Sequence, residues 1–212
     1  MPLTAASPAT APSGDSRTPG SPRLSADERR IEICRAALQV IAARGFAGTT
    51  LRDVAAEAGV VHGLLRHYFG GRDALLAAAF DLAATEATQA FGDLPDDPVD
   101  ALRAWLQPLN SEHYLLWIDA WSEAPRSPEL HTTLVRHERF CESDLKGLLE
   151  RGAREGVFTL AAPAAAVAST IIATMDGLAV QDHALAMIGA RAARTRLLLV
   201  VETLVGLSSG TL

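Results

Sequence analysis

Two short apolar-striped segments separated by a glycine, within residues 49–69, constrain the fold of this sequence more than any other feature. Thr49 or Thr50 can cap a helix with its hydroxyl. Gly59 can adopt the positive φ of a tight turn, and a second short helix is predicted over 62–69. Two such helices form a helix-turn-helix, whose second helix enters the major groove of DNA. The first helix has apolar residues three or four apart: Leu51, Val54, Ala55 and Ala58.

The outward positions of this helix pair define the candidate DNA contacts. Arg52 lies on the outer face of the first helix and can reach a guanine edge. Gly63 allows close approach of the backbone to the groove, and the amides at the helix start near Thr50 can bind phosphate. The alternative is that these residues are solvated surface. The set predicted to contact bases or phosphates is Thr50, Arg52, His62, Gly63, Leu64, Arg66, His67 and Arg72.

The order of residues in 27–80 resembles the DNA-binding domain of the TetR family of bacterial transcriptional repressors. The shared features are Gly-Phe, Thr-Thr-Leu, Asp-Val-Ala, Ala-Gly-Val, a glycine three residues later and His-Tyr-Phe. Val61 stands where the family often has Ser, Leu64 where a small polar residue is common, and Arg66 where it usually has a phosphate-contacting Tyr. The resemblance implies the docking mode on DNA and leaves the base sequence open.

Helical periodicity continues through the rest of the chain, and no stretch alternates as a strand does. The sequence therefore predicts an all-α fold, an N-terminal three-helix domain with a helix-turn-helix followed by a C-terminal helical bundle. Residues 1–25 are predicted to be a disordered arm, 26–71 the DNA-binding domain and 72–212 the ligand-binding and dimerisation domain. Besides 51–58 and 62–69, helices are expected over 26–43, 72–91, 99–109, 111–124, 128–155, 164–188 and 191–206.

The net charge of −6 is unevenly distributed. Residues 26–75 hold seven Arg against six acidic residues, so the acidity lies away from the predicted DNA face. Two cysteines and the absence of a basic, apolar leader in 1–25 predict reduced thiols in a cytoplasmic protein. The uncharged stretch 156–175 is long enough to span a membrane. Its small residues and Pro163 favour a buried interface helix and no membrane partner.

Aromatic residues and one acid in the C-terminal half suggest a small-molecule site. His113, Trp117 and Trp121 repeat every four residues, which is typical of core packing and also of a pocket wall. Asp176, in an apolar stretch, either reaches solvent or anchors a ligand or a dimer mate. A pocket with Asp176 would suit an amine or quaternary ammonium effector. The predicted ligand set is Phe80, Trp105, His113, Tyr114, Trp117, Trp121, His137, Cys141, Met175 and Asp176.

Two alternatives remain open for His137 and Cys141, which fall one turn apart on a helix. They are core or pocket residues, and two ligands without a third argue against a metal site, so no metal and no cofactor are expected. No hydrolase, P-loop or zinc-protease motif is present, which argues against an enzyme.

The last two long helices have wide apolar faces that would bury against a second subunit in a homodimer, as the resemblance also implies; an ordinary monomer core is the alternative. We therefore expect a ligand-responsive regulator, most simply a repressor released from a palindromic double-stranded DNA operator by a small-molecule effector. The alternative is a small-molecule-binding helical protein with a degenerate DNA-binding head. The predicted dimer interface is Val167, Ile171, Leu178, Leu197, Val201 and Leu204.

Overall fold

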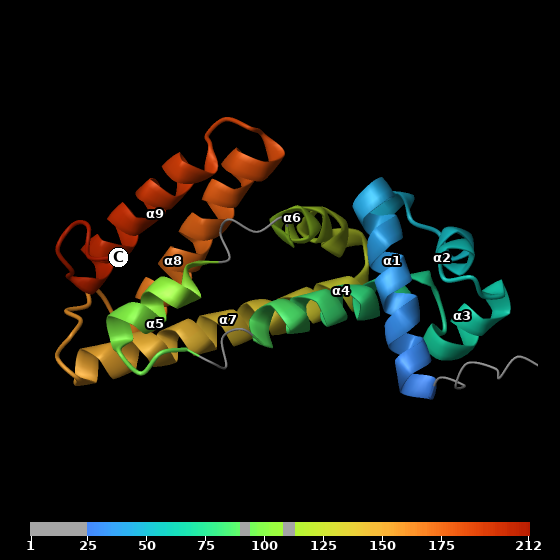
Figure 1. Cartoon of the computed structure of the whole chain (residues 1–212), viewed down its shortest axis with the longest axis horizontal. Coiled ribbons are helices and arrows are strands. Elements are labelled where there is room, and N and C mark those ends of the chain that lie inside the picture. The colour runs from blue at the N-terminus through green and yellow to red at the C-terminus, as the bar shows by residue number, and fades with distance from the viewer. Residues whose placement is uncertain (1–24, 90–93, 108–112) are drawn as a thin grey trace, which may run out of the picture.

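Nine α-helices account for most of residues 25–89, 94–107 and 113–212, the part of the chain that the computed structural model describes (Figure 1). No strand occurs in these ranges, and the predicted all-α fold is confirmed. The predicted arm lies outside the described residues except for Ser25. The helices are α1 (Ala26–Gly48), α2 (Leu51–Glu57), α3 (His62–Phe69), α4 (Arg72–Gln89), α5 (Pro98–Trp105), α6 (His113–Glu123), α7 (Pro128–Arg154), α8 (Ala164–Ala179) and α9 (Ala190–Val205).

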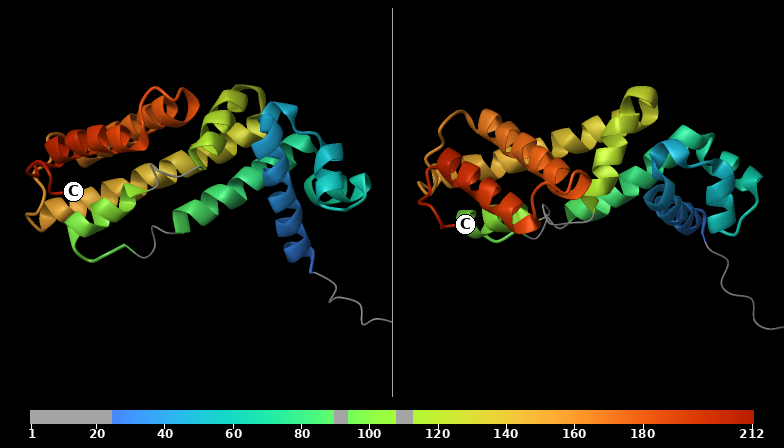
Figure 2. Two further views of the ribbon diagram at one scale, coloured as in Figure 1. Left: turned by 45° about the horizontal axis from the view of Figure 1, so that its top comes forward. Right: turned by 90° about the horizontal axis from the view of Figure 1, so that it is seen from above.

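The molecule is elongated, with α1, α2 and α3 forming a head at one end (Figure 1). Helices α4 and α7 pack against each other and lead away from the head. At the far end α7 contacts α5 and α8, and α8 contacts α9. The two further views show the same separation of the head from the α8–α9 pair (Figure 2). Any signal between the two ends must therefore pass through α4, α6 and α7.

Side-chain caps fix where several helices begin. Ser25 and Glu28 form a reciprocal capping box at the start of α1. Thr50 caps α2 by accepting from the backbone N–H of Asp53, and Asp97 caps α5 in the same way. Ser127 caps α7, whose first residue is a proline. These caps satisfy amide groups that would otherwise lack a partner.

Two helix ends differ from the prediction. Helix α1 runs to Gly48 rather than to 43, but Gly45 breaks it with φ of 73° and ψ of 168°. Helix α8 ends at Ala179, and a π-helical turn, Val180–Ala184, replaces the continuous helix predicted to 188. The periodicity of apolar residues continues through both places, which is why the sequence pattern did not show either break.

The buried side chains form two separate cores. The first joins the head helices to α4 and to Ala120, Ala124, Leu130 and Leu134 of the region from α6 to α7. The second joins α5 and the later part of α7 to α8 and α9. Because the first core extends past residue 72, the head is packed onto part of the C-terminal region and is not an independent unit.

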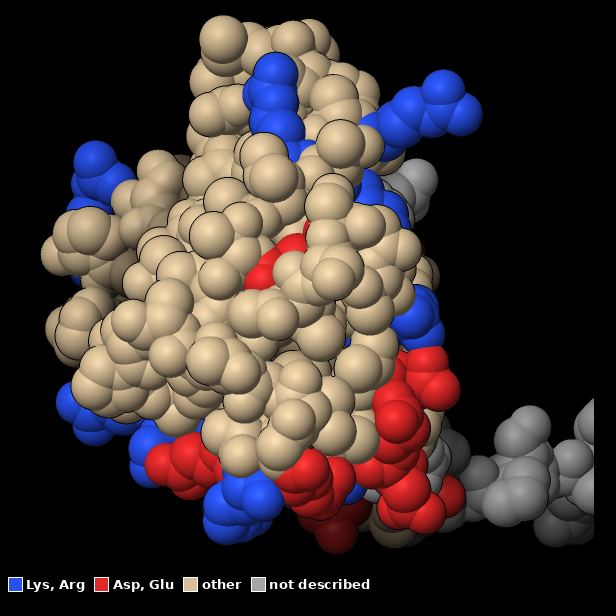
Figure 3. All heavy atoms as spheres, turned by 90° about the vertical axis from the view of Figure 1, so that its left-hand side faces the viewer, with Lys and Arg blue, Asp and Glu red and all other residues tan. Residues whose placement is uncertain are grey.

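At the end of the molecule opposite the head, most acidic side chains gather along the lower edge of the view, basic side chains are spread around the rim, and the middle is uncharged apart from a small acidic patch (Figure 3). There Glu202, buried in α9, accepts hydrogen bonds from the backbone N–H groups of Gly210 and Leu212 at 3.0 and 2.9 Å. The carboxylate thus holds the last residues of the chain against the second core.

Within the described ranges one segment, Ala164–Ala184, is long and apolar enough to span a membrane. Core helices of soluble proteins can be equally long and apolar. In this fold α8 packs between α7 and α9, although only a third of an apolar window within this segment is buried.

Candidate DNA-binding and effector sites

Helices α2 and α3 expose several polar and basic side chains of the head. Leu65 and Phe69 point into the first core, which fixes the orientation of α3. Gly59 makes the turn between the helices with φ of 63°. Leu64 is half-buried, so it offers less surface than was predicted. The predicted contact residues that are exposed on α2 and α3 are Arg52, His62, Gly63, Arg66 and His67.

Thr50 is exposed but already engaged. Its hydroxyl accepts from the Asp53 N–H at 3.2 Å and donates to the Asp53 carboxylate at 2.6 Å. These hydrogen bonds lower the pKa of Asp53. The residue therefore serves first as the cap that defines the start of α2.

Arg72, one of the predicted phosphate contacts, is engaged in several contacts within the subunit. Its guanidinium donates to the carbonyl oxygens of Thr49, at 2.7 Å, and of Phe46. It also pairs with Asp73 at 2.8 Å and lies 3.8 Å from Glu123 of α6. These contacts tie the start of α4 to the end of α1, and the phosphate contact of Arg72 stays a prediction.

Helix α6 also forms a hydrogen bond with the end of α1, close to the contacts of Arg72. The carboxylate of Asp119 accepts a hydrogen bond of 2.6 Å from the backbone N–H of Phe46, directly after the break at Gly45. The Gly45 carbonyl accepts from the Thr49 hydroxyl at 2.7 Å. Sequence reasoning missed Asp119 because its partner is a backbone amide 73 residues away.

The other side of α6 belongs to an aromatic cluster. The Trp117 ring centroid lies 4.9 Å from Phe80 of α4, edge to face, and 6.1 Å from Trp121. His137 of α7 lies 6.1 Å from Phe80 and 6.4 Å from Trp117. Four of the predicted ligand residues are therefore brought together next to the first core.

The third tryptophan, Trp105, lies apart from this aromatic cluster. Trp105 is buried in the second core, and its indole N–H donates to Asp144 at 2.9 Å. Trp117 and Trp121 pack against the first core, so the three tryptophans do not form a single cluster. Met175 is also buried in the second core. The side chain of His113 lies outside the described part of the structure.

A half-buried acidic site lies between the two cores. Trp121 donates its indole N–H to Glu138 of α7 at 3.0 Å. Burial, with the nearby Glu138 charge, raises the pKa of Asp176 in α8 to about 7. Burial also raises the pKa of Glu138 and, with that carboxylate nearby, the pKa of Cys141 to about 12. Both carboxyl groups therefore hold a proton more readily than an exposed carboxyl group does.

Tyr114 of α6 lies near Asp176 and packs against His183. Their rings stack with centroids 6.0 Å apart and planes 9° from parallel. His183 lies in the π-helical turn after α8, and burial and Asp176 raise the pKa of Tyr114. Neither Glu138 nor His183 was predicted. Glu138 follows His137 by one residue on α7, and consecutive residues of a helix point in different directions, so the sequence carried no signal for it.

His137 is a hydrogen-bonded core histidine. Its Nε2 lies 2.7 Å from Asp81 Oδ1, and Asp81 also pairs with Arg136. Among the described residues no group of three His, Cys, Asp or Glu side chains is placed to hold a metal ion.

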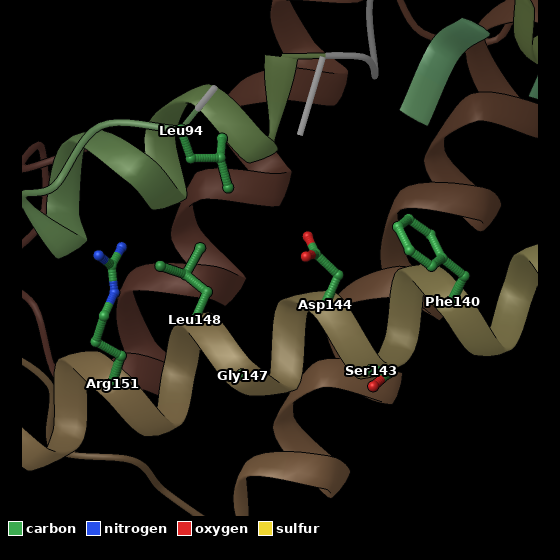
Figure 4. A pocket seen from close by; sticks show the side chains of 7 residues that line it. All are labelled: Leu94, Phe140, Ser143, Asp144, Gly147, Leu148 and Arg151. Atoms are coloured by element: carbon green, nitrogen blue, oxygen red, sulfur yellow. The ribbon is translucent and has the colours of Figure 1, made fainter. Parts of the chain in front are cut away.

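Two cavities open along α7. One of about 400 Å³ is lined by Leu94 and by α7 side chains, with Asp144, Leu148 and Arg151 on the side that faces Leu94 (Figure 4). The other, of about 530 Å³, is lined by residues of α4 and α7, including His137. Phe140 and Asp144 line both cavities, and of the predicted ligand residues only His137 lines either.

The residues predicted for the dimer interface need correction. Five of them are buried inside the subunit and belong to the second core, so their side chains are not available to a partner. Leu204 is half-buried. The exposed side chains of the same helices include Ser169, Thr170 and Ala173 of α8 and Leu199 of α9. The five buried residues are Val167, Ile171, Leu178, Leu197 and Val201.

A helix-turn-helix head joined to an all-helical bundle defines a class of proteins, the helix-turn-helix transcriptional regulators. Family models place the chain within that class. Residues 33–79 match the bacterial regulatory proteins of the tetR family, and residues 98–206 match the C-terminal region of the BetI-type transcriptional repressors. The chain belongs to the TetR family, with a C-terminal region of the BetI type.

Individual relatives agree. An HTH-type transcriptional regulator BetI from Burkholderia mallei is 33% identical over 159 residues, covering 66% of this chain and 80% of the relative. The BetI regulator of Stenotrophomonas maltophilia is 34% identical over 112 residues, 48% of this chain. The matched stretch spans 57% of that relative.

Solved structures share the fold. A Rhodococcus sp. protein described as a TetR-family transcriptional regulator superposes with a TM-score of 0.75 at 27% identity, covering 84% of this chain and 99% of its own. A regulator from Saccharomonospora viridis in complex with choline superposes with a TM-score of 0.70 at 21% identity, covering 83% of this chain and 96% of its own.

Proposed function

We propose that this protein is a cytoplasmic, homodimeric transcriptional repressor that binds a palindromic operator and releases it when a small organic cation binds. The observation that carries the DNA-binding part is the exposed face of α3. It presents His62, Arg66 and His67 and no acidic side chain, on a helix whose other face is fixed in the first core. Such a face suits the phosphates and base edges of a major groove.

The proposed effector is a quaternary ammonium or a related amine. Trp117 and Trp121 supply aromatic faces, which attract cations. Glu138 and Asp176 supply two carboxyl groups, and their raised pKa values mean that burial disfavours their charge in the absence of a cation. The Saccharomonospora viridis neighbour binds choline, which makes choline the first probe.

Helix α6 supports a physical route between the two sites. Trp117 and Trp121 occupy one side of α6, while Asp119 and Glu123 reach α1 and Arg72 from another. A cation that binds against Trp117 and Trp121 therefore moves α6, and with it the carboxylates of Asp119 and Glu123 that contact the head. Because the coupling is a free energy between two sites, operator DNA must weaken cation binding by the same factor.

The exposed parts of α8 and α9 are the proposed dimer surface. The end view shows a broad area with few charged side chains (Figure 3). Leu185, Met187 and Leu199, on or between these helices, are large apolar side chains left exposed on the subunit. A twofold contact there would place two heads on two half-sites of one operator.

The function is tested by selecting duplexes from a random DNA library with the full chain at about 0.1 M salt, where purely electrostatic binding is partly suppressed. Enrichment of a palindrome, and its release by choline, is the expected result. Diffuse, salt-labile binding would instead favour the alternative, a cation-binding helical protein with a degenerate head. The Val61 cap of α3, which makes no side-chain hydrogen bond, is the observation behind that alternative.

A further inference from the structure

Val61 is the most exposed large apolar side chain among the described residues, at 75%. It occupies the N-cap of α3, with φ of −73° and ψ of 139°, and makes no capping hydrogen bond. A Ser, Thr, Asp or Asn at this position would satisfy an amide at the helix start and stabilise the helix. The sequence therefore places a valine where neither burial nor capping explains it.

The surroundings of Val61 point to one kind of contact. His62 and Gly63 follow it on the exposed face, and no atom lies within 4 Å of a Cβ added at Gly63. The side chains that are exposed along α3 include Arg66 and His67, and the helix carries no acid. An exposed valine with neutral and basic neighbours is suited to contact with a negatively charged polymer that also exposes an apolar group. The N-terminal residues of a recognition helix are also those that reach base edges.

We propose that Val61 is a specificity-determining residue that packs its methyl groups against the C5-methyl of a thymine in each operator half-site. The major groove carries one apolar group, that methyl, and apolar side chains read it by contact. This inference rests on the proposed DNA-binding function. The contact distinguishes thymine from cytosine and from uracil, which lack the methyl, without any hydrogen bond.

The test uses duplexes enriched from a random library by the full chain. Each thymine of the enriched site is replaced singly by deoxyuridine, which removes only the C5-methyl, and affinity is measured at fixed salt. We expect one position in each half-site where the replacement weakens binding about fourfold, the factor that corresponds to burying one methyl-sized group. Val61→Ala, which removes both γ-methyl groups, should reduce the difference between the thymine and deoxyuridine duplexes at that position.

Two controls separate a contact from a general loss. Val61→Ile keeps a branched apolar side chain and should retain the discrimination. Ile31→Ala changes another exposed apolar residue of the head, on α1, and should also retain it. Absence of any deoxyuridine effect in an enriched site, or an effect of undiminished size in Val61→Ala, overturns the assignment while leaving the regulator intact. Failure to enrich any sequence overturns the DNA-reading function itself.

Discussion

The Asp119 carboxylate and the Phe46 backbone N–H are joined by a hydrogen bond of 2.6 Å across the junction of α6 and α1. It is placed where Gly45 interrupts α1, so it satisfies an amide that the helix itself cannot. One bond therefore connects the helix that carries Trp117 and Trp121 to the end of the helix that leads into the reading head.

Replacing Asp119 should uncouple the two ends of the molecule. Asp119→Ala leaves the Phe46 N–H without its partner, which should lower the free energy of unfolding by about 1–3 kcal/mol. The ratio between the operator affinities measured without and with choline should fall. The operator affinity of the folded, choline-free protein should change by a smaller factor than this ratio does. Asp119→Asn keeps an acceptor oxygen and should retain most of both. Coupling that is unchanged in Asp119→Ala, measured by operator titration with and without choline, would remove α6 from the route.

The break in α1 should tolerate only glycine. Gly45 combines φ of 73° with ψ of 168°, and an added Cβ would lie 3.1 Å from Asp119 Oδ2. Gly45→Ala should therefore cost at least about 1–3 kcal/mol of stability. Gly59→Ala is the matched variant, since Gly59 also has a positive φ but has no atom within 4 Å of an added Cβ. Denaturant unfolding of both variants should show the larger loss for Gly45→Ala.

Arg66 and Arg72 should have different effects on DNA binding. Arg66 is exposed on α3, so Arg66→Ala should weaken binding to all sequences and reduce the salt slope by about one. Arg72 is bonded to Thr49 and Phe46, so Arg72→Ala should lower the melting temperature instead. A salt slope reduced equally by both substitutions would confirm Arg72 as a phosphate contact.

Asp176 should make stability depend on pH. Its pKa in the folded state is about 7, above the ordinary 3.8, so the folded state holds the proton more tightly than the unfolded state. Stability should therefore fall as pH rises from about 4 to about 7. Asp176→Asn removes this loss and should be more stable than the parent at pH 8, by up to about 4 kcal/mol, with no such gain at pH 4. The exposed Asp96 provides a control variant, Asp96→Asn.

Cation affinity should rise over the same range. At pH 6 Asp176 is mostly protonated in the free protein, and at pH 8 it is mostly ionised. An organic cation beside it should therefore bind several-fold more tightly at pH 8. Titration with choline, followed by the fluorescence of the tryptophans, measures this. Affinity that does not change with pH, or that changes equally in Asp176→Asn, would place the cation away from this carboxyl group.

The sequence predicted what depends on local spacing. The helix-turn-helix around Gly59 follows from apolar residues three or four apart and a turn, and the structure places Leu65 and Phe69 inward as that pattern requires. It did not predict features that depend on distant partners. Arg72 shows only a charge in the sequence, whereas its contacts within the subunit are with carbonyl groups more than twenty residues earlier.

The same limit applies to the ligand site and to the dimer surface. Helical periodicity identified Val167 and Ile171 as apolar and inward but could not say that the neighbour they face is their own subunit. The predicted ligand set joined Trp105 to the repeat of Trp117 and Trp121, yet Trp105 lies in the other core. The half-buried Glu138 was missed because a charged residue on a helix is usually solvated, and only its bond to Trp121 reveals otherwise.

The first core, which crosses residue 72, also determines how the protein opens. Helices α1 to α4 share that core with Ala120 and Ala124, so the head cannot lose its packing without exposing the region that carries Trp117 and Trp121. Reading and sensing therefore belong partly to one cooperative unit of local unfolding. We therefore expect a molecule that binds and stiffens the face of Trp117 and Trp121 to slow local unfolding of the head, even where it touches none of the residues proposed to contact DNA.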